Sequence, residues 1–422
     1  MKIEKKVLTE ALRVLGKVVS QTSPEAVLRQ VRFLGCGDTV TAMATDGSEV
    51  IALRLVAEAE GNVDFAVEYK ALREMVRTAK GTLELEGVKF AWPEVAVVPA
   101  DAESVDLPQN FAGLLALAAP VVDRFEVRRT LQGINLSADG IAVTDGRQLL
   151  HLPVGWNLKA NLTLPFPHAL LAAAPQGPGR LWCWVNCFKL EIGSFSWIGR
   201  SLGNYPNWKQ VIPEDKALDY RITLRETEPL TAFLKSVPDH PPYHGIEFNV
   251  TPQGVVVIPM DFPGMELKVD AEFTGVRPRA VLSLNKYTLL RMLQQGYHSF
   301  RAHSDGMMPV IAEGDAGRFI AMPLRLNRPA TVPSSTQPAQ TNQPNKEETT
   351  MEQETKKPET EAVSAFDELN ANVEELRFKL KSLCEDSTVL VRKIKEAALQ
   401  QKQKEREFIQ AKRAIERIKM AI

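Results

Sequence analysis

The feature that most constrains this chain is a short Thr-Asp-Gly segment that occurs twice between apolar runs. One copy occupies residues 144–146, inside the run 141–150, and the other begins 99 residues earlier, at 45–47. Asp-Gly between apolar residues predicts the tight turn of a β-hairpin, because Gly adopts positive φ at no steric cost. Such self-similarity at a fixed distance indicates duplicated domains, each organised around one hairpin.

The hydrophobic pattern around these hairpins extends the repeat. Apolar residues with helical spacing predict helices at 7–19, 69–80, 111–122, 168–174, 228–237 and 286–295. Strand-like runs separate them, among them 27–34, 39–55 and 95–98 in the first repeat. The order helix, strands, helix, strands therefore recurs three times, although the third pass lacks the Thr-Asp-Gly. We expect an α+β fold with antiparallel sheets and three similar domains in tandem, at 1–105, 106–215 and 216–326.

The composition limits the class of protein. A chain of 422 residues with 44% hydrophobic and 24% charged residues is typical of a soluble protein of several domains. No apolar stretch approaches membrane length, and the N-terminus enters an amphipathic pattern directly, so we expect a cytoplasmic location. The four cysteines are too few and too scattered for a disulfide framework or a zinc site, and no cofactor is expected.

The pattern changes after residue 326. Residues 327–361 are rich in Pro, Thr, Gln, Asn and Glu, which predicts a disordered linker. Residues 362–422 carry mostly apolar side chains at alternating spacings of three and four from Phe366 to Ile422, which predicts a long coiled-coil helix. Its acidic first half and basic second half indicate antiparallel pairing or docking on an acidic partner.

Enzyme chemistry has little support in the sequence. Asp46 and Asp145 could form an acidic pair, but each precedes Gly, so a structural role in a turn is favoured. The six histidines show no metal-ligand spacing, and the pair at 240 and 244 is interpreted as a loop. No nucleophile motif or phosphate loop occurs. We therefore expect a protein without catalytic activity.

Two further motifs carry a resemblance to a known family. Gly-Asn-Tyr-Pro-Asn-Trp-Lys-Gln-Val-Ile-Pro occupies 203–213, and Met-Pro-Leu-Arg-Leu occupies 322–326. With the repeated domains they make residues 1–326 resemble the bacterial DNA polymerase III beta subunit, the sliding clamp. The resemblance implies two chains joined head to tail in a homodimeric ring, with sheets outside and two helices of each domain inside. It also implies that the ring tethers a polymerase to duplex DNA.

A ring that slides must attract phosphates without reading bases. Basic residues on the predicted helices of the first and third domains are the candidates for this contact. They are Arg13, Lys17, Lys70, Arg73, Arg77, Lys80, Lys235, Lys286 and Arg291. The middle domain departs from this pattern, because its predicted helices at 111–122 and 168–174 contain no Lys or Arg.

The resemblance also implies a groove for short peptide motifs of polymerase and clamp-loader subunits, between the second and third domains. Its residues would be Leu131, Thr144, Gly146, Arg147, Leu149, Pro206, Gln210, Val211, Ile320, Met322, Pro323, Leu324 and Arg325. Arg147-Gln148 stands where the family usually has His-Arg, and Gln210 stands where it usually has Arg. We therefore expect an altered motif preference.

Two functions follow as hypotheses. The first is a ring-forming processivity factor that encircles DNA and holds a polymerase. The alternative is a clamp-derived scaffold with weak DNA encirclement, which recruits a partner through the predicted coiled coil at 362–422.

Overall fold

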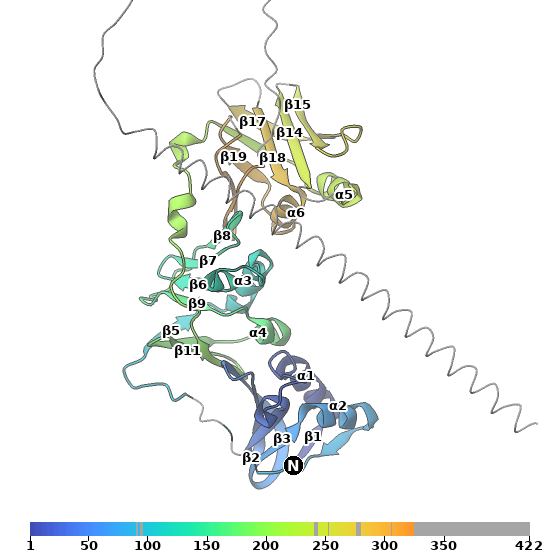
Figure 1. Ribbon diagram of the computed structural model, residues 1–422, viewed down its shortest axis with the longest axis vertical. Coiled ribbons are helices and arrows are strands. Elements are labelled where there is room, and N and C mark those ends of the chain that lie inside the picture. Colours follow the sequence, from blue (N-terminus) through green and yellow to red (C-terminus); the bar gives the residue numbers. More distant parts are fainter. Residues whose placement is uncertain are drawn as a thin grey trace, which may run out of the picture. The chain divides into compact units, whose positions relative to one another are not determined.

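The computed structural model describes residues 1–89, 92, 96–239, 244–251, 253–275, 280–304 and 306–324 (Figure 1). The predicted linker at 327–361 and the predicted coiled coil at 362–422 lie outside the described residues. The division into domains at 105 and 215 stays a prediction.

Six α-helices form in the described part of the chain, and each lies within a predicted helix or starts close to its expected first residue. They are α1 (Lys5–Leu15), α2 (Tyr69–Thr78), α3 (Phe111–Ala118), α4 (His168–Ala173), α5 (Glu228–Ser236) and α6 (Lys286–Gln294). Local chemistry sets one end of two of these helices. Gly16 terminates α1 beside Tyr69, and a Cβ on it would lie 2.0 Å from the Tyr69 hydroxyl oxygen. The Asn285 side chain caps α6 by accepting from the backbone N–H groups of Tyr287 and Thr288.

The strands are short except for the first hairpin. They are β1 (Lys2–Glu4), β2 (Gln30–Thr45), β3 (Glu49–Glu68), β4 (Thr82–Glu84), β5 (Glu103–Leu107), β6 (Ile134–Ser137), β7 (Gly140–Thr144), β8 (Gln148–Leu152), β9 (Leu162–Leu164), β10 (Gly179–Trp184), β11 (Cys187–Ile192), β12 (Phe195–Arg200), β13 (Tyr220–Leu224), β14 (Gly245–Thr251), β15 (Gly254–Pro259), β16 (Leu267–Val269), β17 (Ala271–Gly275), β18 (Ala280–Asn285), β19 (Ser299–Ala302), β20 (Val310–Gly314) and β21 (Gly317–Ala321). Among the described residues, every pairing between these strands is antiparallel, as predicted.

Two sheets continue from one third of the chain into the next. In the first, β3 pairs with β12, giving the order β4-β1-β3-β12-β11-β10-β5 with β2 attached to β3. In the second, β21 pairs with β8, giving the order β17-β13-β19-β20-β21-β8-β7-β6-β9. A further sheet has the order β16-β15-β14-β18. These shared sheets explain why the thirds of the chain are joined by backbone hydrogen bonds as well as by side chains.

The apolar faces of the helices are buried as their periodicity predicts. Leu8, Leu12 and Leu15 of α1 are buried, and α1 contacts both α2 and α4. In the same way α3 contacts α4, and α5 contacts α6. Among the largest buried side chains are Trp197 and Phe188, whose rings meet edge to face at 4.9 Å, a favourable aromatic geometry.

Some strand predictions were wrong in detail. Most of the strand-like runs predicted at 27–34 and 39–55 belongs to the long hairpin of β2 and β3, with irregular register near Gly35 and Gly37, but residues 26–29 form a 3-10 helix. Residues 96–98 form no strand, although one was expected at 95–98. The strand β5 was missed, because its alternation is short and its partner β10 lies more than 70 residues away in the sequence.

Candidate functional site

The second Thr-Asp-Gly forms a turn that is closed by hydrogen bonds of its own side chains. The Thr144 hydroxyl donates to the Gln148 carbonyl at 2.6 Å and accepts from the Gly146 N–H at 3.0 Å. One carboxylate oxygen of Asp145 accepts from the backbone N–H groups of Arg147 and Gln148, at 2.8 and 2.9 Å. This confirms the structural interpretation of Asp145, because a carboxylate held in this way shapes the backbone.

The first copy repeats these hydrogen bonds. The Thr45 hydroxyl donates to the Glu49 carbonyl at 2.7 Å, and one Asp46 carboxylate oxygen accepts from the Ser48 and Glu49 N–H groups at 2.8 and 2.9 Å. The strands that follow also correspond, since Glu49 pairs with Gly199 and Gln148 pairs with Ala321 across the two shared sheets. The predicted repeat is therefore present at the level of individual bonds, with Glu49 and Gln148 as equivalent positions.

A segment between the second and third repeats, residues 203–218, packs on the second shared sheet; we call it the connector. Tyr205 and Trp208 of the connector are buried against sheet residues. The cluster that they join comprises Leu131, Ala142, Leu149, Tyr205, Trp208, Ile311 and Ile320, with Ile212 and Leu218 at its margin. The Tyr205 hydroxyl accepts from the Thr144 N–H at 2.8 Å, and burial raises the pKa of this phenol. The connector is thereby tied to the turn.

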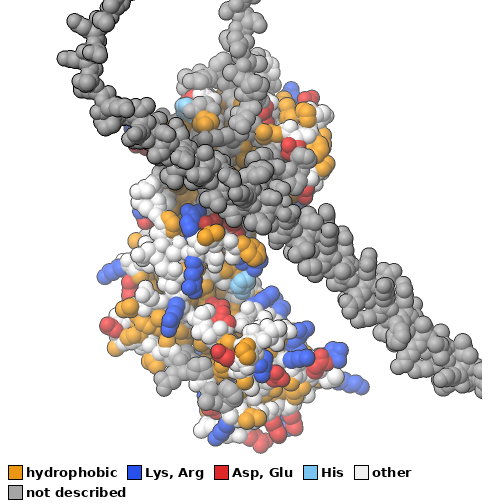
Figure 2. All heavy atoms as spheres, in the orientation of Figure 1, with side chains coloured by type: hydrophobic (Ala, Val, Ile, Leu, Met, Phe, Trp, Pro, Cys, Tyr) orange, Lys and Arg blue, Asp and Glu red, His pale blue; other side chains and the backbone are white. Residues whose placement is uncertain are grey.

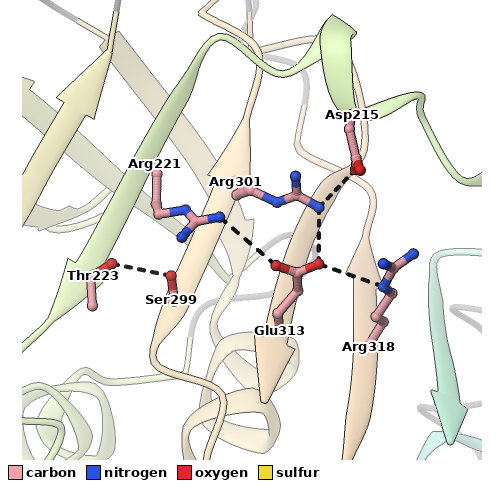
Figure 3. Close-up of polar contacts among 7 residues, drawn as sticks. All are labelled: Asp215, Arg221, Thr223, Ser299, Arg301, Glu313 and Arg318. Carbon is pink, nitrogen blue, oxygen red and sulfur yellow. Dashed lines mark hydrogen bonds and ion pairs between the residues drawn. The ribbon is translucent and has the colours of Figure 1, made fainter. Parts of the chain in front are cut away.

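Ion pairs fasten the rest of the connector. Lys209 pairs with Asp139 at 2.6 Å. Near the end of the connector, Asp215 accepts from Arg301 of β19 at 2.8 Å, and Arg301 also reaches Glu313 of β20 at 3.0 Å (Figure 3). In the same view Arg318 of β21 approaches Glu313 at 3.5 Å. The Arg301 side chain is only 15% exposed, but its connector partner Asp215 is 68% exposed, so water screens this ion pair and its contribution to stability is that of a surface pair.

A cavity of about 210 Å³ opens between the connector, the turn and the end of β21. Its lining is mostly apolar and comes from four separate segments. The residues are Arg128, Leu131, Thr144, Gly146, Arg147, Gln148, Leu149, Pro206, Asn207, Trp208, Val211, Ile320 and Met322. Val211 and Met322 remain 51% and 46% exposed at the cavity, so apolar surface there is open to a ligand.

A second cavity, of about 510 Å³, shares residues 147, 148 and 322 with the first. Its lining is more polar. The residues are Asp145, Arg147, Gln148, Asn285, Tyr287, Thr288, Arg291, Met322, Pro323 and Leu324. Together the two cavities, which we call the groove, offer an apolar half and a polar half side by side. That arrangement suits a short peptide with apolar side chains and a few polar contacts.

The structure brings together most of the groove residues predicted from sequence. Leu131, Thr144, Gly146, Arg147, Leu149, Pro206, Val211, Ile320 and Met322 line the first cavity, and Pro323 and Leu324 line the second. Gln210 is exposed and lines neither cavity, whereas Arg325 lies outside the described residues. Sequence reasoning missed Trp208, although it lies within the quoted motif, and Asn285, Tyr287 and Thr288. The last three come from α6 and the residue that caps it, which the sequence gives no reason to place beside the turn.

The two cavities meet at a chain of polar side chains. The Arg291 guanidinium donates to the Gln148 side-chain oxygen at 2.7 Å, and the Gln148 amide donates to the second Asp145 oxygen at 2.6 Å. Burial lowers the pKa of Arg291, and the neighbouring Asp145 carboxylate partly opposes this effect. The guanidinium still stays charged at any physiological pH.

Basic residues of the first third gather around a separate hollow between α1 and α2. Arg13, Lys17 and Arg73 line this cavity of about 380 Å³, together with Tyr69, whose hydroxyl donates to the Leu12 carbonyl at 3.0 Å. Figure 2 shows Lys and Arg side chains clustered over α1 and α2. Among the described residues, none of the three cations has a hydrogen bond or ion pair to another side chain. We call this the cationic hollow; its charge attracts anions such as phosphates.

The other candidates for DNA contact fall into different environments. Lys70, Lys80 and Lys235 are exposed, and Arg77 is exposed but paired with Glu74 at 2.7 Å.

Two candidates are corrected by their placement. Lys286 is 4% exposed, and its ammonium donates to the Val237 carbonyl and to Asp239, so it is a structural residue. Its spacing of three and seven from Leu289 and Leu293, both buried on α6, was the signal that sequence reasoning overlooked. Arg291 points into the groove instead.

Neither a metal site nor a membrane span stands out in the part of the chain that the structure describes. Its residues contain no group of three His, Cys, Asp or Glu side chains placed to hold a metal ion. None of its helices combines the length and the apolar character that crossing a membrane requires.

Solved structures of bacterial sliding clamps are similar to this chain. The clamp of Pseudomonas aeruginosa, solved with a ligand, is 18% identical over 77% of this chain and 99% of its own, with a TM-score of 0.66. The clamp of Caulobacter crescentus is also 18% identical, with the same coverage and a TM-score of 0.62. The DNA polymerase III beta subunit of Bartonella birtlesii, bound to griselimycin, is 15% identical over 77% and 99%, with a TM-score of 0.67.

The likeness is one of structure. No family model matches the chain, and no curated protein matches it in sequence. The solved clamps are covered almost from end to end, and the match takes in 77% of this chain. The described part of this chain therefore has the fold of a bacterial DNA polymerase sliding clamp.

Proposed function

We propose that this protein is a DNA sliding clamp, a non-enzymatic processivity subunit of the cytoplasm. Two chains form a ring around duplex DNA, and the groove holds short peptide motifs of a polymerase or a clamp loader. The observation that carries the proposal is the coverage of 98–100% of the solved clamps by one chain, with a TM-score of 0.62–0.67. A chain that had lost part of the ring-forming fold would not cover them so completely.

The mechanism is topological. A closed ring converts dissociation from DNA into diffusion along it, so its contacts with DNA need only be weak and independent of sequence. The cationic hollow suits this role, because Arg13, Lys17 and Arg73 have no carboxylate partner among the described residues and are free to approach phosphates. Such contacts lose strength as salt rises, because binding releases counterions.

Retention on circular DNA tests the proposal. Wild-type protein, loaded on a nicked circular plasmid and passed over a sizing column, should stay with the DNA and should be lost once the plasmid is linearised. Equal retention on both templates would contradict a ring.

A triple variant, R13Q with K17Q and R73Q, tests the cationic hollow. On short linear duplex DNA, where no topological link forms, its equilibrium binding should be weaker than that of wild type. The slope of log Kobs against log salt should be shallower by roughly 3, because about 0.9 counterion is released per phosphate contact. Arg54→Gln, on the exposed side of β3, is the matched control and should behave as wild type. An unchanged slope in the triple variant would remove the cationic hollow from the DNA contact.

The alternative is a clamp-derived scaffold with weak DNA encirclement. One observation favours it: α3 and α4 contain no Lys or Arg, so the middle third offers less positive charge from its helices than the first. In the retention assay this alternative predicts no difference between the templates.

The segment at 362–422 is proposed to be a coiled coil that recruits a partner or a second chain. Removing residues 327–422 and measuring the mass in solution tests this. If the deletion lowers the mass of the assembly by more than the mass of the deleted residues, the assembly has lost chains and the tail adds an oligomeric contact. If the number of chains per assembly is unchanged, the tail adds no such contact.

A further inference from the structure

Arg291 differs from the other arginines of intermediate exposure in the described residues. Arg29 pairs with Glu68, Arg32 pairs with Asp64 at 2.8 Å, and Arg301 pairs with Asp215 and Glu313. Arg291 has only a neutral acceptor, the side-chain oxygen of Gln148. A cation taken partly out of water is costly without an opposite charge, so its counter-ion is missing from this part of the chain.

The nearest carboxylate at the groove cannot fill this role. Asp145 accepts two backbone N–H groups on one oxygen and the Gln148 amide on the other. Gln148 therefore stands between Asp145 and Arg291 and bonds to both. The Arg291 guanidinium has five N–H groups, one of which makes this contact, and Arg291 lines the second cavity.

A second cation lies at the same boundary. Arg147 is exposed, lines both cavities, and forms no ion pair with the described residues; its backbone carbonyl accepts from the Met322 N–H at 2.8 Å. Arg128, the other arginine of the groove, already pairs with Glu126 at 2.8 Å. Arg147 and Arg291 are thus the two arginines of the groove without an ion pair among the described residues, and both line the second cavity, Arg147 where it meets the first.

We infer that the ligand of the groove carries a carboxylate, bound where the two cavities meet by the guanidinium groups of Arg291 and Arg147. The inference rests on the proposed function, in which the groove takes a short peptide. An apolar side chain of that peptide fills the first cavity, and the carboxylate follows it into the second. Arg291 provides a forked donor that matches a carboxylate better than an amide, because two parallel N–H groups meet two oxygens.

Two sources of the carboxylate are possible in a peptide, an acidic side chain and the free C-terminus. A peptide array separates them. Each hexapeptide of the array has an apolar residue, Leu, Met or Phe, at two positions. Each of its other positions is occupied in turn by Asp, Asn or Ala. Every sequence is made with an amidated and with a free C-terminus. Binding of the labelled full-length protein to the array selects the tightest sequence, and fluorescence anisotropy then gives its Kd and that of its uncharged counterpart.

In wild type the carboxylate peptide should bind about 10-fold tighter than its amide counterpart, the usual size of one charge-assisted hydrogen bond. Arg291→Gln should abolish this preference while the amide peptide binds as before. Arg291→Lys, which keeps the charge and loses the fork, should retain part of it. Arg147→Gln should weaken it, and Arg54→Gln is the matched control. Thermal unfolding of each variant shows that the fold is intact.

The outcomes distinguish a wrong carboxylate assignment from a wrong assignment of the groove. If peptides bind the groove but the Asp and Asn forms, and the free and amidated forms, have equal Kd in wild type, the carboxylate assignment is wrong and the peptide groove stands. The same conclusion follows if Arg291→Gln keeps the full preference. If no peptide binds wild type more tightly than a variant with Met322→Ala and Leu324→Ala, the groove itself is wrong and the carboxylate assignment fails with it.

Discussion

Replacing Glu49 by Gln should stabilise the protein above neutral pH and change little at low pH. Glu49 occupies the position of Gln148 in the repeat, where the first shared sheet passes from β3 to β12. Its carboxylate accepts from the Trp197 indole N–H at 2.6 Å, and Trp197 is 1% exposed. Burial, together with the nearby Asp46 carboxylate, raises the pKa of Glu49 to about 7.

The magnitude follows from proton linkage. Well below pH 4.5 Glu49 is protonated in both the folded and the unfolded chain, so the stability of the protonated buried form is fully present. As the pH rises, the unfolded chain releases its proton near 4.5 and the folded chain near 7, and this stability is lost across that window. Each pKa unit corresponds to about 1.4 kcal/mol, so the loss reaches ~3 kcal/mol at pH 8 and stays below ~1 kcal/mol at pH 5.

Gln at position 49 keeps an oxygen to accept from Trp197 and has no charge to bury. Urea unfolding at pH 5 and pH 8, followed by tryptophan fluorescence, measures the difference between Glu49→Gln and wild type. Glu60→Gln, on an exposed part of β3, is the matched control and should show no gain at either pH. A gain of equal size at both pH values, or none at pH 8, would refute the reasoning.

Three further outcomes are expected. Gly16→Ala should destabilise the protein by about 2 kcal/mol, because the new Cβ would lie 2.0 Å from the Tyr69 hydroxyl oxygen. A thermal midpoint equal to that of wild type would contradict this packing at the end of α1. Tyr205→Phe should lower the free energy of unfolding by about 1 kcal/mol and weaken peptide binding, because the Thr144 N–H loses its acceptor. Calorimetry measures the stability and anisotropy the peptide Kd, and wild-type values of both would show that other contacts hold the connector. Met322→Ala should lower polymerase processivity with no change in the helical circular dichroism, and full processivity would remove this residue from the groove.

Local chemistry made several parts of this protein predictable. The turn at 144–148 closes with hydrogen bonds between residues no more than four apart, so Thr-Asp-Gly carries its own geometry wherever it occurs. The helices were predictable for a similar reason, because a stripe of apolar residues at helical spacing forms one buried face. For α6 the same reasoning, applied fully, would have placed Lys286 inside with Leu289.

The sequence by itself determined the repeated hairpin, the helices with their apolar faces, and the antiparallel α+β class. Each of these rests on interactions between near neighbours in the chain. The groove segments near 131, 144, 206 and 320 were expected from the family resemblance alone, whereas only the tertiary structure decided that α6 borders this groove and that Arg291 faces it. The physical reason is that burial and the choice of ion-pair partner depend on which distant segment packs beside a residue, and no local pattern encodes that.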